Sequence, residues 1–205
     1  TELLTKVGRV QFILLSLVIV GFIFLGKNFI ALWAGTGYEY SYGITLMLIV
    51  PATIPLIQGL TLEIMRAKNM HKVRSFVYFA MAICNVFISI PCIRYWGAQG
   101  AAIGTAITLI IFDCIVMNIY YHKYVGLDMR YYWIQILKFV PAFVPIIMLE
   151  ILLQHFFPST GFAALIGQGI AYMAVFSVFM WMFGLNETEK KLVTGPLESL
   201  LKKKG

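Results

Sequence analysis

Charged residues are scarce in this chain of 205 residues. Asp, Glu, Lys and Arg together make up 12% of it, while 60% of its residues are hydrophobic. A soluble domain is about 25% charged and about 45–50% apolar. The scarcity of charge therefore excludes an ordinary soluble domain and indicates an integral membrane protein. Stretches in which polar and apolar residues alternate are also lacking, which argues against a transmembrane β-barrel.

Motifs of catalysis and metal binding are missing as well. The three cysteines, Cys84, Cys92 and Cys114, lie inside apolar runs without CxxC spacing, whereas metal sites need clustered ligands. The sequence has no phosphate-binding GxxxxGK[ST], no GxSxG and no HExxH motif. We therefore expect no metal, no cofactor and no enzymatic activity.

Six apolar stretches are present instead, and each is long enough to cross a bilayer as a helix, for which about 20 residues are needed. They cover residues 10–34, 44–65, 75–96, 100–121, 133–153 and 162–184. The sequence thus predicts an all-α integral membrane protein with six transmembrane helices.

The basic residues are unevenly distributed among the connecting segments. The net charge is +7, and of the 16 Lys and Arg only Lys27, Arg94 and Lys138 lie outside the two ends and the second and fourth loops. Basic loops stay in the cytoplasm, so both ends of the chain are predicted to be cytoplasmic. Topology and contact with membrane lipids explain the positive charge, and no nucleic-acid partner is expected.

The chain divides by composition into five parts. They are a cytoplasmic connector (1–9), four transmembrane helices (10–122), a cytoplasmic loop (123–132), two further transmembrane helices (133–184) and a basic amphipathic tail (185–205). Asn186 is expected to cap a helix in the tail, which we expect to lie on the membrane surface.

The second stretch contains two prolines one turn apart, Pro51 and Pro55, followed by Gln58 and Gly59. A proline removes a backbone donor and crowds the carbonyl four residues earlier, so the helix must bend or open here. Interrupted helices mark binding sites or hinges in transporters. Pro51, Pro55 and Gly59 are candidate hinge positions and Gln58 is a candidate pathway residue, with a simple packing kink as the alternative.

Two polar residues lie in the middle of apolar stretches. Asn85 is expected to form a hydrogen bond between helices, with substrate contact as the alternative. A charged Asp113 in mid-membrane costs about 2.5–3.5 kcal/mol on insertion scales. Asp113 therefore needs water, a basic partner or a proton, and we expect it to act in proton or cation coupling or as a polar contact in a cavity; a structural hydrogen bond is the alternative.

The segment around Gly97 is expected to turn the chain between two antiparallel helices. After it, Gly100, Gly104 and Thr108 form a stripe of small residues that lets helices approach closely. At about 100° per residue, Asp113 is predicted on the face opposite Gly104.

The last two stretches offer few polar residues. Lys138, in the fifth stretch, is expected to extend its side chain to the interface, or to face a basic cavity. Glu150 lies near the outer end of the same stretch. The sixth stretch reads as a peripheral helix that faces lipid.

The order of these features resembles a known family. A Leu-Trp-Ala-Gly-x-x-Tyr loop (32–38) precedes the helix with Pro51; a basic turn (66–74), the helix with Asn85 and a Gly-x-x-Gly-Ala-Ala-Ile-Gly-Thr segment (97–105) follow. This order resembles the C-terminal half of bacterial polysaccharide flippases in the multidrug/oligosaccharidyl-lipid/polysaccharide exporter superfamily. The resemblance covers about residues 1–130 and is most specific over residues 85–105.

The resemblance implies a fold of two six-helix lobes around a cavity that opens alternately to each side of the membrane. Residues 10–122 would be the last four helices of the second lobe, and residues 133–184 two accessory helices. The N-terminal lobe of the same protein would complete the transporter. The substrate implied is a polyprenyl-diphosphate oligosaccharide, moved from the inner to the outer leaflet of the bacterial inner membrane for surface polysaccharide synthesis. Other glycan-assembly membrane proteins would be partners.

Three other functions are compatible with six apolar helices. A cation-coupled multidrug exporter of the same superfamily would also need a carboxylate in the membrane. A membrane enzyme acting on polyprenyl-phosphate sugars would need acidic or histidine clusters in its loops, which the short loops here do not offer. A scaffold subunit would leave Asp113 unexplained.

Overall fold

The computed structural model describes the chain except for residues 36, 157–160, 188, 192–193 and 195–205. Every element in the described part is a helix, which confirms the all-α class. Five helices are long and apolar enough to cross a membrane: Glu2–Trp33, Tyr40–Ala67, His71–Val125, Met129–Phe156 and Phe162–Gly184. The chain thus has the helices of a membrane-embedded protein.

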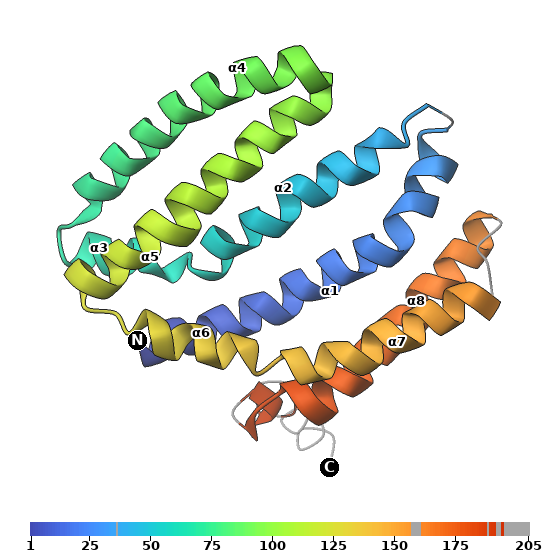
Figure 1. Cartoon of the computed structure of the whole chain (residues 1–205). Coiled ribbons are helices and arrows are strands. Elements are labelled where there is room, and N and C mark those ends of the chain that lie inside the picture. The colour runs from blue at the N-terminus through green and yellow to red at the C-terminus, as the bar shows by residue number, and fades with distance from the viewer. Residues whose placement is uncertain (36, 157–160, 188, 192–193, 195–205) are drawn as a thin grey trace, which may run out of the picture. The chain divides into compact units, whose positions relative to one another are not determined.

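The third of these helices turns back on itself. In α4 (His71–Leu109) the backbone of Gly97 has φ 57° and ψ −134°, a conformation that a residue without a Cβ adopts readily. Figure 1 shows α4 running along one arm, reversing, and returning beside itself. The stretches 75–96 and 100–121 are therefore the two arms of one hairpin, which we call the hairpin of residues 71–125.

The two arms of the hairpin touch through small residues. A Cβ placed on Gly100 would collide with the backbone carbonyl of Cys92, and one on Gly104 would collide with the side chain of Ser89. Thr108, one turn further on, is fully buried. These three positions lie on the face of the returning arm that packs against the outgoing arm.

The returning arm continues beyond α4 in wider turns. It passes through the π-helix η1 (Ile110–Met117), the short α5 (Asn118–Tyr120) and a second π-helix, η2 (Tyr121–Val125). Gly126, with φ 76°, ends the arm. A π-helix is rare and is frequently found at functional sites.

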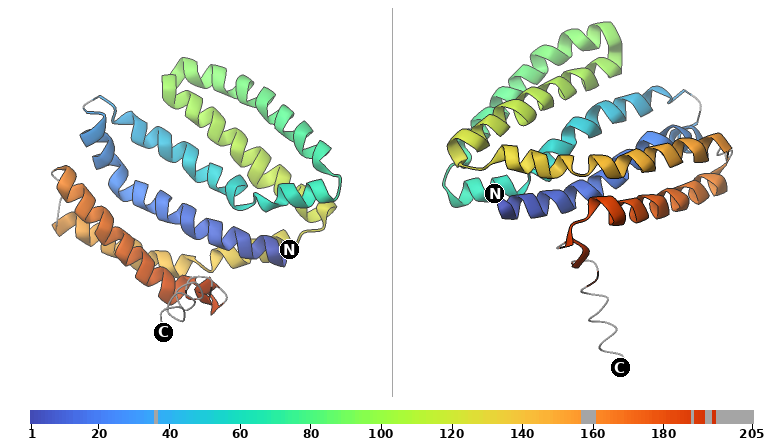
Figure 2. Two further views of the ribbon diagram at one scale, coloured as in Figure 1. Left: turned by 180° about the vertical axis from the view of Figure 1, so that it is seen from behind. Right: turned by 60° about the horizontal axis from the view of Figure 1, so that its bottom comes forward.

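Two helical segments precede the hairpin, and the second is interrupted. The helix α1 (Glu2–Trp33) begins eight residues before the first predicted span, so residues 2–9, the predicted connector, form its first turns. The predicted second span is divided into α2 (Tyr40–Ile57) and α3 (Leu60–Ala67). The interruption lies at Gln58 and Gly59, directly after the two prolines inside α2. Figures 1 and 2 both show α1 and α2 side by side.

The predicted fifth span is divided too. It consists of α6 (Met129–Leu137) and α7 (Val140–Phe156), and Pro141 lies at the start of α7, where a missing backbone donor is tolerated. The sixth span is α8 (Phe162–Phe179) followed by the π-helix η3 (Met180–Gly184), with the predicted bounds.

The chain folds as two compact units, residues 1–135 and 136–205. The first contains the elements from α1 to most of α6, and the second contains α7, α8 and η3. In the second unit, Asn186 accepts a hydrogen bond from the backbone N–H of Glu189 (2.9 Å), and Glu189 accepts one from the N–H of Asn186 (2.8 Å). This reciprocal pair is a capping box and confirms the predicted cap at Asn186. Most of the basic tail after it lies outside the described residues.

Gly100→Ala should destabilise the hairpin of residues 71–125. The added methyl group would meet the backbone of Cys92, which cannot rotate away, and overpacking of this kind costs about 1–3 kcal/mol. The free energy of unfolding in bilayers measures the effect. Gly167→Ala in α8 is the matched control, because a Cβ there meets nothing within 4 Å and alanine favours a helix by roughly 0.5–1 kcal/mol. Equal stability of the two variants would contradict the tight contact between the arms.

Candidate functional site

The polar residues of the hairpin meet around Asp113. This aspartate lies in η1 and is 3% exposed. Its Oδ1 accepts a hydrogen bond from the hydroxyl of Tyr78, on the outgoing arm, at 2.7 Å. Its Oδ2 is buried and has no hydrogen-bond partner among the described residues. Half of the carboxylate is thus satisfied, and the other half is available to a proton, a cation or a donor group.

The face on which Asp113 lies differs from the sequence prediction. Thr108 accepts a hydrogen bond from Asn85 at 3.1 Å, and Asp113 accepts one from Tyr78. Both partners belong to the outgoing arm, so Asp113 shares the packing face with Thr108, and the prediction that it lies opposite was wrong. The reason is η1, because its wider turn places residues five apart on one face, whereas the prediction assumed 100° per residue throughout.

A basic side chain reaches Asp113 through Tyr78. One guanidinium nitrogen of Arg74 donates to the Tyr78 hydroxyl at 3.1 Å, and another donates to the Tyr121 hydroxyl at 3.5 Å. The guanidinium carbon lies 5.1 Å from the centre of the Tyr78 ring, which is within the range of a cation–π contact. Arg74, Tyr78 and Asp113 therefore form a hydrogen-bonded chain that connects a cation to a carboxylate. We call it the Arg74–Asp113 relay.

Asn118 joins a second group of residues to the same place. Its Oδ1 accepts hydrogen bonds from Gln58 at 3.0 Å and from the indole N–H of Trp133 at 2.8 Å. Its Nδ2 donates to the backbone carbonyl of Asp113 at 2.9 Å. Gln58 lies at the interruption between α2 and α3 and is 2% exposed. The side-chain amide of Asn118 thus connects Gln58 to η1.

The Tyr132 hydroxyl completes the interruption between α2 and α3. It donates to the backbone carbonyl of Ile57 at 2.8 Å, and Tyr132 is fully buried. In an apolar environment, a carbonyl freed at a helix end needs a partner of this kind. The break at Gln58 and Gly59 is thus held by α6 and by Asn118.

Asn85 has a structural position. Its amide donates to Thr105 at 3.3 Å and to Thr108 at 3.1 Å, and its carbonyl oxygen accepts from Ser89 at 3.1 Å. These bonds tie the two arms together, as expected for an interhelical hydrogen bond. Asn85 and Tyr78 also line an open concavity of about 360 Å³ on the outgoing arm, so the alternative of substrate contact stays open.

The other candidate residues lie apart from this network. Lys138 is exposed between α6 and α7, in the second unit. Pro51 is buried inside α2, while Gly59 is exposed at the interruption. In the part of the chain that the structure describes, no group of three or more His, Cys, Asp or Glu side chains could hold a metal ion.

Several residues of the network, Tyr121 and Tyr132 among them, were missed in the sequence. Arg74 was assigned to a basic loop, although it lies one turn before Tyr78, within reach on the same helix face. Asn118 and Trp133 were not singled out. An asparagine inside an apolar stretch, five residues from Asp113, is a signal that could have found Asn118, since polar side chains in such stretches need partners.

Comparisons of the chain with protein-family models, with curated proteins and with solved structures found no match. The helices and the site define the class of protein: an all-α, membrane-embedded protein with a buried aspartate in a hydrogen-bond network.

The hydrogen bond between Tyr78 and Asp113 should contribute measurably to the stability of the hairpin. Hydrogen bonds between membrane helices are worth about 0.6 kcal/mol on average and up to about 1.7 kcal/mol. A double-mutant cycle with Tyr78→Phe and Asp113→Ala should give a coupling energy in this range, measured from the free energies of unfolding in bilayers. Tyr95→Phe, at a tyrosine that is 80% exposed, is the control. Effects that add within about 0.3 kcal/mol would show that the bond contributes nothing.

Proposed function

We propose that this chain is part of a bacterial inner-membrane transporter that moves a polyprenyl-diphosphate-linked oligosaccharide from the inner to the outer leaflet by alternating access. The observation that carries the proposal is the Asp113 carboxylate, which is buried in an apolar hairpin with one oxygen satisfied by Tyr78 and the other without a partner among the described residues. The order of sequence features from residue 32 to residue 105 supports the choice of substrate.

A buried carboxylate in a membrane helix is costly and is typically retained for a function such as a proton relay or an ion pathway. The Arg74–Asp113 relay suits such a function because its middle member can change partners. With Asp113 charged, the Tyr78 hydroxyl donates to it and accepts from Arg74. When Asp113 takes up a proton on Oδ2, it becomes a donor itself and its attraction for Tyr78 weakens. Protonation would thus loosen the contact between the two arms.

The interruption between α2 and α3 provides a point at which the structure can bend. Pro55 leaves the carbonyl four residues earlier without a donor, and the interruption follows at Gln58 and Gly59. Because Gln58 and Asp113 are both bonded to Asn118, bending at this point would be felt at the carboxylate. This coupling is the kind of link that alternating access requires.

The proposal includes a topology of six passes with both ends of the chain in the cytoplasm. The hairpin of residues 71–125 supplies two passes, with its reversal at Gly97 on the outer side. The other apolar helices supply one pass each. The N-terminal lobe of the same protein would close the cavity on the side of the hairpin that bears Tyr78 and Asn85.

A cation-coupled drug exporter is the second candidate function. The same half-satisfied carboxylate favours it, because a cation or proton taken up at Asp113 could drive export of a small molecule. The substrate distinguishes the two candidates, since lipid-linked glycan should be transported in one case and amphiphilic drugs in the other.

Asp113→Asn in the complete protein should abolish or strongly reduce transport while leaving expression intact. The amide keeps the shape of the carboxylate but cannot take up a proton or a cation. Transfer of a polyprenyl-diphosphate glycan across reconstituted vesicles measures the activity, with drug efflux measured in parallel. Asp128→Asn is the matched control, because Asp128 is exposed and its side chain accepts a hydrogen bond from the backbone N–H of Tyr131, which an amide oxygen can also accept. Unchanged transport in Asp113→Asn would remove this residue from the mechanism.

Reporter fusions should place residue 97 outside the cytoplasm and residues 70 and 126 inside it. Alkaline phosphatase folds only outside the cytoplasm, so a fusion after residue 97 should be active and fusions after residues 70 and 126 inactive. The basic residues from Arg66 to Arg74 are expected to hold their loop in the cytoplasm. Activity of the fusion at residue 70 would contradict the proposed orientation.

A further inference from the structure

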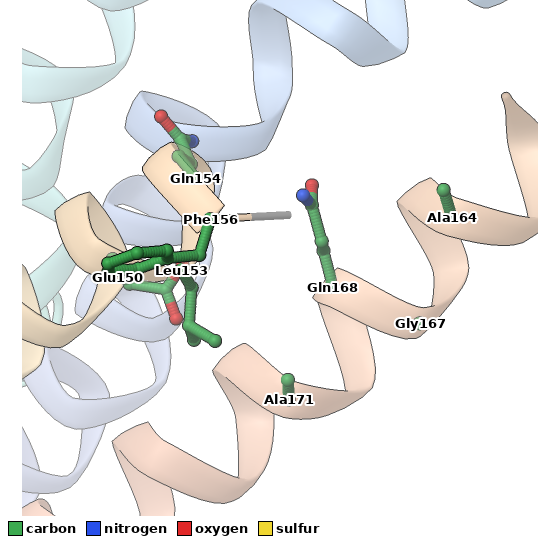
Figure 3. A pocket seen from close by; sticks show the side chains of 8 residues that line it. All are labelled: Glu150, Leu153, Gln154, Phe156, Ala164, Gly167, Gln168 and Ala171. Atoms are coloured by element: carbon green, nitrogen blue, oxygen red, sulfur yellow. The ribbon is translucent and has the colours of Figure 1, made fainter. Parts of the chain in front are cut away.

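The second unit has a cavity of its own, between α7 and α8. Its volume is about 530 Å³, and its lining is mostly small or apolar, with Phe156 and Gly167 among the contributors. Three polar side chains also line it: Glu150, Gln154 and Gln168. Figure 3 shows Gln168 extending from α8 toward α7, on which Glu150 lies. The sequence had suggested a featureless sixth helix facing lipid; that interpretation overlooked Gln168.

Glu150 is the unusual member of this cavity. Its side chain is 1% exposed, and Oε1 has no hydrogen-bond partner among the residues that the structure describes. A buried carboxylate without a partner is strongly unfavourable in an apolar environment. Because no cation in the described part of the unit reaches it, the carboxylate needs a proton, a water molecule or a donor on a bound molecule, and the cavity beside it has room for such a molecule.

The depth of Glu150 limits what that donor can be. Glu150 lies six residues before Phe156, where α7 ends, which corresponds to about 9 Å along the helix at 1.5 Å per residue. The polar region of a bilayer adds about 5–7 Å on each side of the hydrocarbon core. The carboxylate is therefore within reach of lipid headgroups, just below their level, while the apolar lining of the cavity suits the upper part of the acyl chains.

The acceptors of the cavity match a primary ammonium group. An ammonium carries a positive charge and three N–H donors, and it would form a charge-assisted hydrogen bond with Glu150. The polar side chains of Gln154 and Gln168 line the same cavity as Glu150. A choline headgroup has the charge without N–H donors, and a glycerol headgroup has hydroxyl donors without the charge.

We propose that the cavity between α7 and α8 binds the headgroup of an ammonium-bearing phospholipid, with Glu150 as the residue that receives the ammonium. The proposal concerns the second unit alone and does not depend on the transport function. It assigns the last two helices a lipid site in addition to their role as membrane spans.

The test is thermal unfolding of the full chain in phosphatidylglycerol vesicles that also contain either phosphatidylethanolamine or phosphatidylcholine. Phosphatidylethanolamine should raise the Tm of the wild type above its value in phosphatidylcholine. The increase should be lost in Glu150→Gln, because the neutral amide of glutamine cannot form an ion pair with an ammonium group. Glu63→Gln, at an exposed carboxylate that pairs with Arg66 at 2.7 Å, should keep the increase. An equal increase in Glu150→Gln would overturn the proposal. So would equal Tm values of the wild type in the two lipids.

Two further measurements keep the test decisive. Native mass spectrometry of the wild type should retain phosphatidylethanolamine in preference to phosphatidylcholine, which does not require the variant to fold; equal retention of both lipids would overturn the proposal. Free ethanolamine in the buffer should leave the Tm unchanged, because it lacks acyl chains for the apolar lining. A shift as large as that with the lipid would assign the cavity to small amines and overturn the lipid assignment.

Discussion

The close approach of the two arms of the hairpin of residues 71–125 is the constraint on which the rest of the first unit depends. Lipid offers helices little hydrophobic reason to associate, so contact relies on packing and on polar bonds. The absence of a Cβ at Gly100 and Gly104 brings the arms together, and only at that separation can Asn85 reach Thr108. Tyr78 can reach Asp113 for the same reason. Backbone packing and the polar network are thus one arrangement.

Within this arrangement, irregular backbone and polar side chains occur together. The interruption at Gln58 and the π-helix η1 both leave backbone groups out of the regular pattern, and lipid cannot satisfy them. Tyr132 and Asn118 do so instead, through the carbonyls of Ile57 and Asp113. The two irregularities share Asn118, so neither can change its geometry independently of the other. This is the physical basis for regarding them as a moving part.

The sequence predicted the regular features well because they follow from local physics. Hydropathy located the apolar helices, the two prolines indicated the interruption at Gln58 and Gly59, and Gly97 indicated the reversal. What it could not predict was the face of Asp113, because nothing local distinguishes a π-helix from an α-helix in an apolar run. The connection of Asp113 to Arg74 was not predicted either, because the sequence indicated that Arg74 belongs to a basic loop. Contacts such as Gln58 with Asn118 join residues 60 positions apart, which no periodicity reveals.

Asp113 and Glu150 are both buried carboxylates, yet their surroundings point to different roles. Asp113 has a donor in Tyr78 and a cation one hydrogen bond further on, so its charge can be balanced within the chain. Glu150 has neither among the described residues and instead lines a cavity. A group whose charge is balanced internally suits a switch, because both protonation states are tolerated. A group that the described chain leaves unbalanced suits binding, since a cationic ligand lowers the cost of burying it.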